Sequence, residues 1–226
     1  NRRQLRAPKD FIELFGERAP RFEPGSKWEY SNYGFVLLGR VIEIVSGESY
    51  VDYVRKHIFE PAGMMSTDNW TLAELPLRVA TGYTRVAPGK RLSGRPFELP
   101  LPPLRPNTDA LLHVGGPAGG GYSTVGDLIR FVEALRNHKL LDAKHTELLI
   151  TAKVDSTGSS NYAYGFGVDQ SRDGVTSVGH NGGAPGVYAQ LIFFPASGYQ
   201  IAVLANRDPQ GAISIIQSVA TRLPPT

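Results

Sequence analysis

Residues 187–205, VYAQLIFFPASGYQIAVLA, carry the strongest strand signals in the sequence. Apolar runs at 187–194 and 199–205 flank a turn with proline and glycine at 195–198, which is typical of a β-hairpin. Strand composition also marks two segments before the hairpin, 161–168 and 175–179. Consecutive strands joined by short turns predict an antiparallel sheet. In residues 211–222 the apolar side chains have helical spacing, and we expect them to lie on this sheet: Ile213, Ile216, Val219 and Ala220.

The residues before the strands carry helical signals. Apolar side chains recur at helical spacing over 33–45, with Ser31 or Asn32 placed to cap the helix and Gly47 to end it. A second helix is predicted over 50–58, capped by Ser49 and ending before Pro61, because a residue that precedes proline is disfavoured in the helical region.

A proline-rich segment separates these helices from the next ones. Residues 86–110 have neither helical nor strand spacing and are interpreted as a functional loop, with prolines at 88, 96, 100, 102, 103 and 106. Thr124, followed three residues later by Asp127, resembles a capping box and predicts a helix through Leu135. A short helix is expected over 143–152. These patterns predict an α+β fold, mainly helix and loop over 22–160 and antiparallel strands with a C-terminal helix over 161–226.

Composition excludes several classes of protein. The 226 residues are 41% hydrophobic and 20% charged, which is ordinary globular usage. The net charge is only +3, and the basic start with Arg2, Arg3, Arg6 and Lys9 is interpreted as a solvated terminus, so no nucleic-acid partner is predicted. The absence of cysteine excludes thiolate catalysis and disulfides. No apolar run reaches the ~18 residues of a membrane span. Since the first residue is not Met, we expect a processed form or a fragment of a longer protein.

Two places could carry chemistry. The first is Tyr30-Ser31-Asn32 at the start of the predicted helix 33–45. A phenol near the positive end of a helix and near a cation has its phenolate form favoured, as a tyrosine general base requires. The alternative is a packed tyrosine beside an Asn32 that only caps the helix.

The second place is residues 179–186, Gly-His-Asn-Gly-Gly-Ala-Pro-Gly, with four glycines in eight positions. Glycines allow a backbone to approach a ligand closely, and free N–H groups there can form an oxyanion hole. His180 could give a hydrogen bond or positive charge to a substrate carboxylate. The alternative is a glycine-rich turn with a surface histidine.

Other chemistry finds no support in the sequence. Neither a phosphate-binding loop nor a dinucleotide fingerprint occurs, and there is no His-Glu-x-x-His. His138 and His145 are interpreted as residues of a solvated helix surface and not as metal ligands. No cofactor and no metal are predicted.

Four motifs in order resemble the class C β-lactamase, DD-peptidase and esterase family of penicillin-recognising serine hydrolases. They are Phe-Glu-Pro-Gly-Ser-Lys-Trp-Glu-Tyr-Ser-Asn-Tyr-Gly at 22–34, Glu-Pro-Ala-Gly-Met at 60–64, Gly-Gly-Gly-Tyr-Ser-Thr with Asp-Leu at 119–128, and Gly-His-Asn-Gly-Gly at 179–183. The likeness covers nearly the whole sequence. It implies a β-lactamase/transpeptidase-like α+β fold, with an antiparallel sheet flanked by helices and a helical region, incomplete at the N-terminus.

The resemblance also implies roles for single residues. Tyr30 would be the proton-transfer tyrosine of Tyr-x-Asn, and Asn32 would bind the catalytic lysine and the amide of the substrate. His180, Asn181 and Gly182 stand where the family has Lys-Thr-Gly, with His180 departing from the β-lactamases proper and with Asn181 and Gly182 facing substrate. The Gly183 N–H would give half of the oxyanion hole.

The nucleophile of the family is absent. No Ser or Thr in the sequence is followed three residues later by Lys, although the family attacks its substrates with the serine of Ser-x-x-Lys. We therefore expect a sequence that starts downstream of its nucleophile and is inactive alone. Its sheet edge and apolar face would need cover from the missing N-terminal segment or another copy.

The leading hypothesis is thus an acyl hydrolase whose full-length parent acts on small molecules or peptides. Esters, amides and small peptides are expected ahead of β-lactams, because neutral imidazole is a poorer partner than lysine for a β-lactam carboxylate. The alternative is a non-catalytic binding or regulatory homologue of the same fold. Analogy with the family suggests a periplasmic or secreted bacterial setting.

Overall fold

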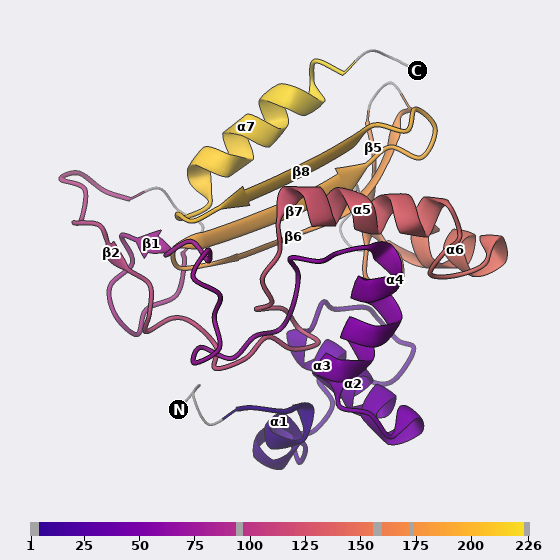
Figure 1. The fold of residues 1–226 in the computed structure, drawn as a ribbon, viewed down its shortest axis with the longest axis horizontal. Coiled ribbons are helices and arrows are strands. Elements are labelled where there is room, and N and C mark those ends of the chain that lie inside the picture. Colours follow the sequence, from indigo (N-terminus) through magenta and orange to yellow (C-terminus); the bar gives the residue numbers. More distant parts are fainter. Residues whose placement is uncertain (1–4, 94–96, 156–159, 172–173, 224–226) are drawn as a thin grey trace. The chain divides into compact units, whose positions relative to one another are not determined.

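The computed structural model describes residues 5–93, 97–155, 160–171 and 174–223. Arg2 and Arg3 of the basic start and Pro96 of the proline-rich segment lie outside the described residues. The structure divides into two compact units (Figure 1). The first unit comprises residues 1–77 and 112–146, and the second comprises residues 78–111 and 147–226.

The first unit is helical. Its elements are α1 (Pro8–Phe15), α2 (Asn32–Ser46), α3 (Tyr50–Val54), a π-helical turn (Arg55–Phe59), α4 (Glu60–Ala62) and α5 (Val125–Arg136); α6 (Ala143–Ile150) runs from this unit into the second. Helix α2 packs against α1 and α3, and α4 packs against α5. Helix α1 is missing from the sequence prediction. Its N-cap residue is Ala7, which has no side chain that could cap the helix. The backbone N–H groups of Arg6 and Ala7 instead donate to the Asp10 carboxylate at 2.7 and 2.9 Å, so a search for capping residues does not find this helix start.

The predicted ends of α2 are confirmed. Ser31 Oγ accepts a hydrogen bond from the Gly34 N–H, and Gly47 ends the helix in the left-handed region with a φ of 74°. Within the helix, a Cβ on Gly39 would lie 2.0 Å from Pro117 Cγ, so the close approach of the Pro117 loop requires glycine there.

The predicted end of the second helix before Pro61 is wrong. Ser49 caps α3 as expected, but the chain continues through the π-helical turn and α4 to Gly63, which has a φ of 71°. In the π-helical turn the Glu60 N–H bonds to the Arg55 carbonyl, so the helical path shifts by one residue just before the proline. Pro61 then occupies the first turn of α4, where a missing N–H costs little.

Helix α5 confirms the prediction of a helix capped by Thr124, whose side chain accepts from the Asp127 N–H. Val132 and Leu135 on its apolar face are buried. The buried Asp127 carboxylate does not close a capping box. It accepts from the Ser66 N–H and Thr67 Oγ1 at 2.7 and 2.8 Å, and so ties α5 to the segment after α4.

The second unit is built on a six-stranded antiparallel sheet in sequence order β3 to β8. Its strands are β3 (Val154–Asp155), β4 (Ser160–Tyr162), β5 (Gly167–Gln170), β6 (Thr176–Ala184), β7 (Val187–Phe193) and β8 (Gln200–Ala205). The proline-rich segment belongs to this unit, and its strand β2 (Arg105–Pro106) pairs antiparallel with β1 (Tyr83–Thr84), which directly precedes the segment. The predicted antiparallel sheet is confirmed, and the hairpin at 187–205 forms β7 and β8.

Two strand boundaries differ from the prediction. Residues 161–168 do not form one strand, because the Ala163 N–H bonds to the Phe166 carbonyl and Gly165 has a φ of 91°, which turns the chain between β4 and β5. The glycine-rich segment is part of β6, since pairing with β7 continues through Gly183 opposite Tyr188. Only Pro185 and Gly186 remain as the turn.

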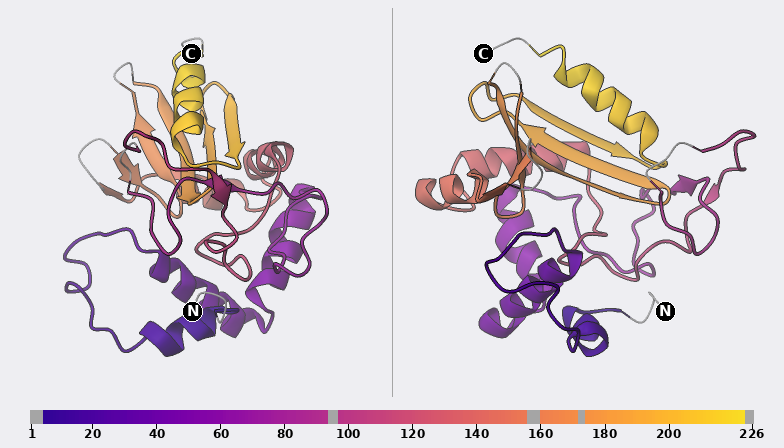
Figure 2. Two further views of the ribbon diagram at one scale, coloured as in Figure 1. Left: turned by 90° about the vertical axis from the view of Figure 1, so that its left-hand side faces the viewer. Right: turned by 180° about the vertical axis from the view of Figure 1, so that it is seen from behind.

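Helix α7 (Gln210–Ala220) runs along one face of the sheet in both views of Figure 2. Ala212 and Ile216 of the helix are buried against Tyr188 of β7. The face predicted from helical spacing is therefore only partly right. Ile216 is buried as expected, whereas Ile213 and Val219 are 37% and 42% exposed, because the buried face runs through Ala212.

Candidate active site

The Tyr-x-Asn motif lies in the first unit, where α2 begins. Tyr30 Oη donates a hydrogen bond to Asn32 Oδ1 at 3.1 Å across the capping residue Ser31. The Tyr30 ring contacts Phe35 one turn into the helix, with 6.0 Å between ring centroids. The side chain is 42% exposed, so the hydroxyl is held by local contacts and remains accessible. The motif thus brings Tyr30 and Asn32 together, and Ser31, not Asn32, is the residue that caps the helix.

Burial shifts the pKa of the Tyr30 phenol. Partial removal of the side chain from water raises the pKa of Tyr30 above 10.0, because desolvation disfavours the charged phenolate. The helix start alone therefore does not make this phenol a base at neutral pH. A cation close to the hydroxyl would be needed to reverse the shift.

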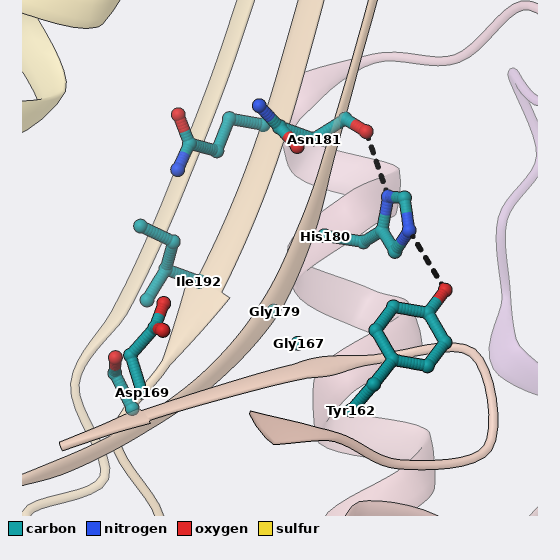
Figure 3. Close-up of a pocket in the computed structure, with 9 residues that line it drawn as sticks. Tyr162, Gly167, Asp169, Gly179, His180, Asn181 and Ile192 are labelled. Atoms are coloured by element: carbon teal, nitrogen blue, oxygen red, sulfur yellow. Dashed lines mark hydrogen bonds between the residues drawn. The ribbon is translucent and has the colours of Figure 1, made fainter. Parts of the chain in front are cut away.

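His180 lies in the second unit, on β6, with both ring nitrogens engaged (Figure 3). Nδ1 lies 2.7 Å from the backbone carbonyl oxygen of Asn181, and Nε2 lies 3.0 Å from Oη of Tyr162. The rings of Tyr162 and His180 meet edge to face, with 5.9 Å between centroids. Tyr162 was not among the predicted site residues.

A hollow of about 240 Å³ lies over the same strands. It is lined by two strand glycines, one aliphatic side chain and a set of aromatic and polar side chains: Gly167, Gly179, Ile192, Tyr162, His180, Asp169, Ser177, Asn181 and Gln190. The Asn181 side chain donates to Tyr188 Oη at 3.3 Å, and that hydroxyl donates to Gln190 Oε1 at 2.7 Å. Since Asn181 and His180 are neighbours on one strand, their side chains start from opposite faces of the sheet. Asn181 therefore points toward the face that α7 covers.

Gly182 and Gly183 lie beyond the end of β5. The register pairs β5 with β6 only as far as Gly179, so among the described residues β6 continues to Ala184 with β7 on one side alone. Ala184 and Val187 close the two-residue turn. Because hydrogen-bonded and non-bonded pairs alternate in an antiparallel ladder, the Gly183 N–H next to this closing pair is directed away from β7. That is the orientation an oxyanion donor requires.

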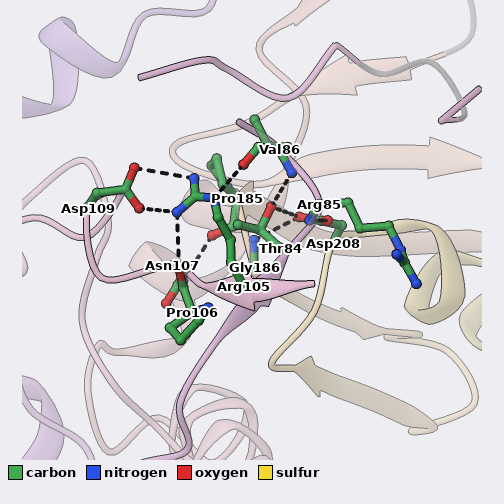
Figure 4. Close-up of polar contacts among 10 residues, drawn as sticks. All are labelled: Thr84, Arg85, Val86, Arg105, Pro106, Asn107, Asp109, Pro185, Gly186 and Asp208. Atoms are coloured by element: carbon green, nitrogen blue, oxygen red, sulfur yellow. Dashed lines mark hydrogen bonds and ion pairs between the residues drawn. The ribbon is translucent and has the colours of Figure 1, made fainter. Parts of the chain in front are cut away.

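The turn after Gly183 is tied down by buried polar residues (Figure 4). Asp208 Oδ1 accepts from the Gly186 N–H at 2.8 Å and from Thr84 Oγ1 at 2.7 Å, and its Oδ2 accepts from the Arg85 N–H at 2.8 Å. From the other side, Asn107 Nδ2 donates to the Pro185 carbonyl at 2.9 Å. Thr84 and Asn107 are fully buried. Thr84 and Arg85 directly before the proline-rich segment, Asn107 within it and Asp208 therefore hold the hairpin that carries Gly182 and Gly183.

Sequence reasoning missed these anchoring residues. Thr84, Asn107 and Asp208 are far apart in the sequence and belong to no motif. Only the sharp Pro185-Gly186 turn signalled that something should fix the hairpin, and nothing in the sequence says what. Their role becomes visible only when the loop and the sheet are placed together.

Among the described residues, no three His, Asp or Glu side chains gather to hold a metal ion. His138 Nδ1 lies 3.3 Å from Thr146 Oγ1, and His145 Nδ1 lies 2.8 Å from Asp142 Oδ1, so each has a local partner. Within the described ranges, no helix is long and apolar enough to span a bilayer.

Comparison with known proteins identifies the family. The family model described as Beta-lactamase matches residues 2–220. The chain is 29% identical to penicillin-binding protein 4* of Bacillus subtilis over 193 residues, which are 83% of this chain and 41% of that protein. A penicillin-binding protein from Bacillus halodurans matches at a TM-score of 0.87 and 31% identity, over 98% of this chain and 65% of that one. A D-stereospecific amidohydrolase from Streptomyces matches at a TM-score of 0.77 and 25% identity, over 96% and 62%.

The chain spans only 41% of the length of penicillin-binding protein 4*, and 51% and 46% of two further relatives, penicillin-binding protein 4 of Amycolatopsis lactamdurans and the penicillin-binding protein PbpX of Bacillus subtilis. The similarity nevertheless runs along nearly all of the sequence, through both units and through the motifs at Tyr30 and His180. The chain has the β-lactamase/transpeptidase-like fold and belongs to the beta-lactamase family of serine hydrolases.

Proposed function

We propose that this chain provides the proton-transfer and oxyanion-binding parts of a serine acyl hydrolase, which acts on an ester, amide, peptide or β-lactam carbonyl. The observation that carries the proposal is the end of β6, where Gly182 and Gly183 extend past β5 next to His180 on a tethered hairpin. A backbone N–H held in this way can stabilise the oxygen of a tetrahedral intermediate without reorganisation. The loss of one such donor typically raises the barrier by about 3 kcal/mol.

In the proposed reaction, a serine hydroxyl adds to the carbonyl carbon and the leaving group departs with a proton. Water then hydrolyses the acyl-enzyme and returns the serine. Tyr30 would move the proton, and Asn32, already bonded to the Tyr30 hydroxyl, would position it. Because burial raises the pKa of Tyr30, this role needs a cation beside the phenol, and the lysine of Ser-x-x-Lys would supply it. We propose that Tyr30 and His180 meet at one cleft.

The nucleophile would come from outside these residues. No Ser-x-x-Lys occurs in the sequence, so the chain alone is expected to be inactive. Helix α2 exposes apolar side chains that a further polypeptide segment could bury. Leu38, Ile44 and Val45 are 59%, 66% and 80% exposed. We propose that an N-terminal segment of a longer form, or another copy, covers such surfaces and that the longer form completes the site.

The proposed substrate order places esters, amides and small peptides ahead of β-lactams. His180 stands where a lysine would offer a permanent positive charge to a carboxylate. One structural relative is a D-stereospecific amidohydrolase, which supports an amide substrate.

The second candidate is a non-catalytic binding homologue, favoured by the missing Ser-x-x-Lys alone. The encoded sequence upstream of Asn1 separates the two candidates. A Ser-x-x-Lys there supports the hydrolase, and its absence supports the binding protein.

The enzyme test compares the 226-residue chain with a form extended by its upstream-encoded residues. Both are assayed on p-nitrophenyl esters, D-amino-acid amides and peptides, and a chromogenic cephalosporin. We expect turnover by the extended form only, and its loss by at least about 100-fold in Tyr30→Phe, the usual scale of general acid–base catalysis. Tyr164→Phe serves as the control, because Tyr164 is 59% exposed and lies outside the motif. An extended form with Ser-x-x-Lys that shows neither turnover nor an acylation burst would contradict the proposal.

A further inference from the structure

The hydrogen bonds of His180 define its tautomer. A backbone carbonyl only accepts hydrogen bonds, so Nδ1, at 2.7 Å from the Asn181 carbonyl oxygen, carries a proton. In the neutral ring Nε2 then has a lone pair, and the Tyr162 hydroxyl at 3.0 Å donates to it. Both nitrogens are used, and the neutral ring has no further N–H to give.

Tyr162 reaches His180 from another strand. Tyr162 on β4 pairs with Gly167 on β5, and Gly167 pairs with Gly179 on β6, the residue before His180. Directly paired residues share a face of the sheet, so the Tyr162 side chain starts from the face of Gly179 and the His180 side chain from the opposite face. Tyr162 is the last residue of β4, where its ring meets the His180 ring edge to face and its hydroxyl lies 3.0 Å from Nε2.

We infer that Tyr162 is a positioning residue, which occupies Nε2 of His180 and fixes the Nδ1–H tautomer of the neutral ring, and so selects against a carboxylate at this end of the site. The inference rests on the proposed acyl hydrolase site and narrows its substrate class. Nε2 is occupied by Tyr162 and the Nδ1–H by the Asn181 carbonyl, so the pair presents the hydroxyl oxygen of Tyr162 as an acceptor and directs no imidazole N–H at the substrate. Substrates with a neutral or N–H-donating group next to the scissile carbonyl fit this acceptor, and substrates with a carboxylate there do not.

Nitrogen NMR tests the geometry without any activity. Long-range proton–nitrogen spectra of the 226-residue chain are recorded at alkaline pH, where imidazole is neutral, with His180→Asn used to assign the signals among the five histidines. We expect a protonated Nδ1 and an unprotonated Nε2, with the Nε2 resonance displaced in Tyr162→Phe and unchanged in Tyr164→Phe. A protonated Nε2, or an Nε2 resonance that is unchanged in Tyr162→Phe, overturns the inference. If a variant of the short chain does not fold, the same spectra of the extended form give the result.

Kinetics of the extended form test the consequence. A matched pair of esters is used, identical except for a carboxylate or a carboxamide next to the scissile carbonyl. We expect the carboxamide to be preferred by about tenfold in kcat/KM, Tyr162→Phe to reduce that preference, and His180→Lys to reverse it. Equal use of both esters by the wild-type protein overturns the substrate claim. Absence of all turnover counts against the proposed function alone, because the NMR result for His180 and Tyr162 stands separately.

Discussion

The carboxylate of Asp208 accepts a hydrogen bond from the backbone N–H of Gly186 at 2.8 Å, and this contact fixes the turn that follows the glycine-rich strand. The same carboxylate accepts from Thr84 Oγ1 and the Arg85 N–H, so one side chain joins the residues directly before the proline-rich segment to the β6–β7 hairpin. The site therefore depends on a loop that lies about 100 residues earlier in the sequence.

Asp208→Asn tests this anchor. In the wild-type chain both carboxylate oxygens of Asp208 accept hydrogen bonds. The asparagine amide replaces one of these oxygens with an NH₂ group, so at least one N–H or O–H donor loses its acceptor. We expect a loss of about 1–3 kcal/mol in the free energy of unfolding, the typical cost of one buried unsatisfied group. Urea unfolding of the chain measures it, with the exposed Glu17→Gln as control. An Asp208→Asn midpoint equal to that of the control would show that the carboxylate does not hold the hairpin.

Two glycines of β6 should respond differently to alanine. A Cβ on Gly179 would meet the Leu191 carbonyl oxygen at 2.2 Å, whereas a Cβ on Gly182 would find no atom within 4 Å. We expect Gly179→Ala to destabilise the chain by about 1–3 kcal/mol, since the backbone of β7 must move, and Gly182→Ala to stay within about 0.5 kcal/mol. Thermal unfolding of the two variants makes the comparison. Equal melting temperatures would contradict the close approach of β6 and β7 at Gly179.

In the isolated chain, Tyr30 should ionise at a higher pH than an ordinary tyrosine. Burial raises its pKa above 10.0, so the folded state favours the neutral phenol. Because the pKa of Tyr30 is raised in the folded state, its contribution to folding stability is fully present below the pKa of the unfolded chain. That contribution is lost as the pH rises through the pKa of the folded state. The difference in ultraviolet absorbance between wild type and Tyr30→Phe should therefore titrate above pH 10.0. A transition below that value would show that a cation already lies beside the hydroxyl.

His180→Lys should change the preference for β-lactams in the extended form. A lysine ammonium offers a charge-assisted hydrogen bond to the β-lactam carboxylate that a neutral imidazole does not. We expect acylation by a chromogenic cephalosporin to rise by roughly tenfold or more, which corresponds to a bond of about 1.5 kcal/mol or stronger. His180→Gln serves as the uncharged control. No gain with lysine would remove the basis for ranking esters and amides above β-lactams.

The sequence predicts local elements well and long-range contacts poorly. Ser31, Thr124 and Gly47 mark helix ends through their own side chain or backbone, and each prediction is confirmed. The continuation of the helix past Pro61 depends on a π-helical turn, which no cap or proline rule signals. The strand predicted over 175–179 stops at Gly179, and only the register with β7 shows that it continues through Gly182 and Gly183.

The candidate site likewise contains local contacts that the sequence predicts and long-range contacts that it does not. Tyr30 and Asn32 are close in sequence, so their contact follows from the start of one helix. Tyr162 lies 18 residues before His180 and Asp208 lies 22 residues after Gly186, and their pairing is fixed by the sheet and the loop. Side chains that meet only through tertiary packing leave no periodic trace in the sequence.

The central claim is that Tyr30 and the His180–Gly183 segment serve one acyl-transfer centre. A crystal structure of the extended form, inhibited by a phosphonate that mimics the tetrahedral intermediate, tests it most directly. We predict the phosphonate bonded to the serine of Ser-x-x-Lys, with one oxygen on the Gly183 N–H and the Tyr30 hydroxyl within hydrogen-bond distance of the serine oxygen. Tyr30 and His180 on unrelated surfaces, with the inhibitor bound elsewhere or not at all, would contradict the account.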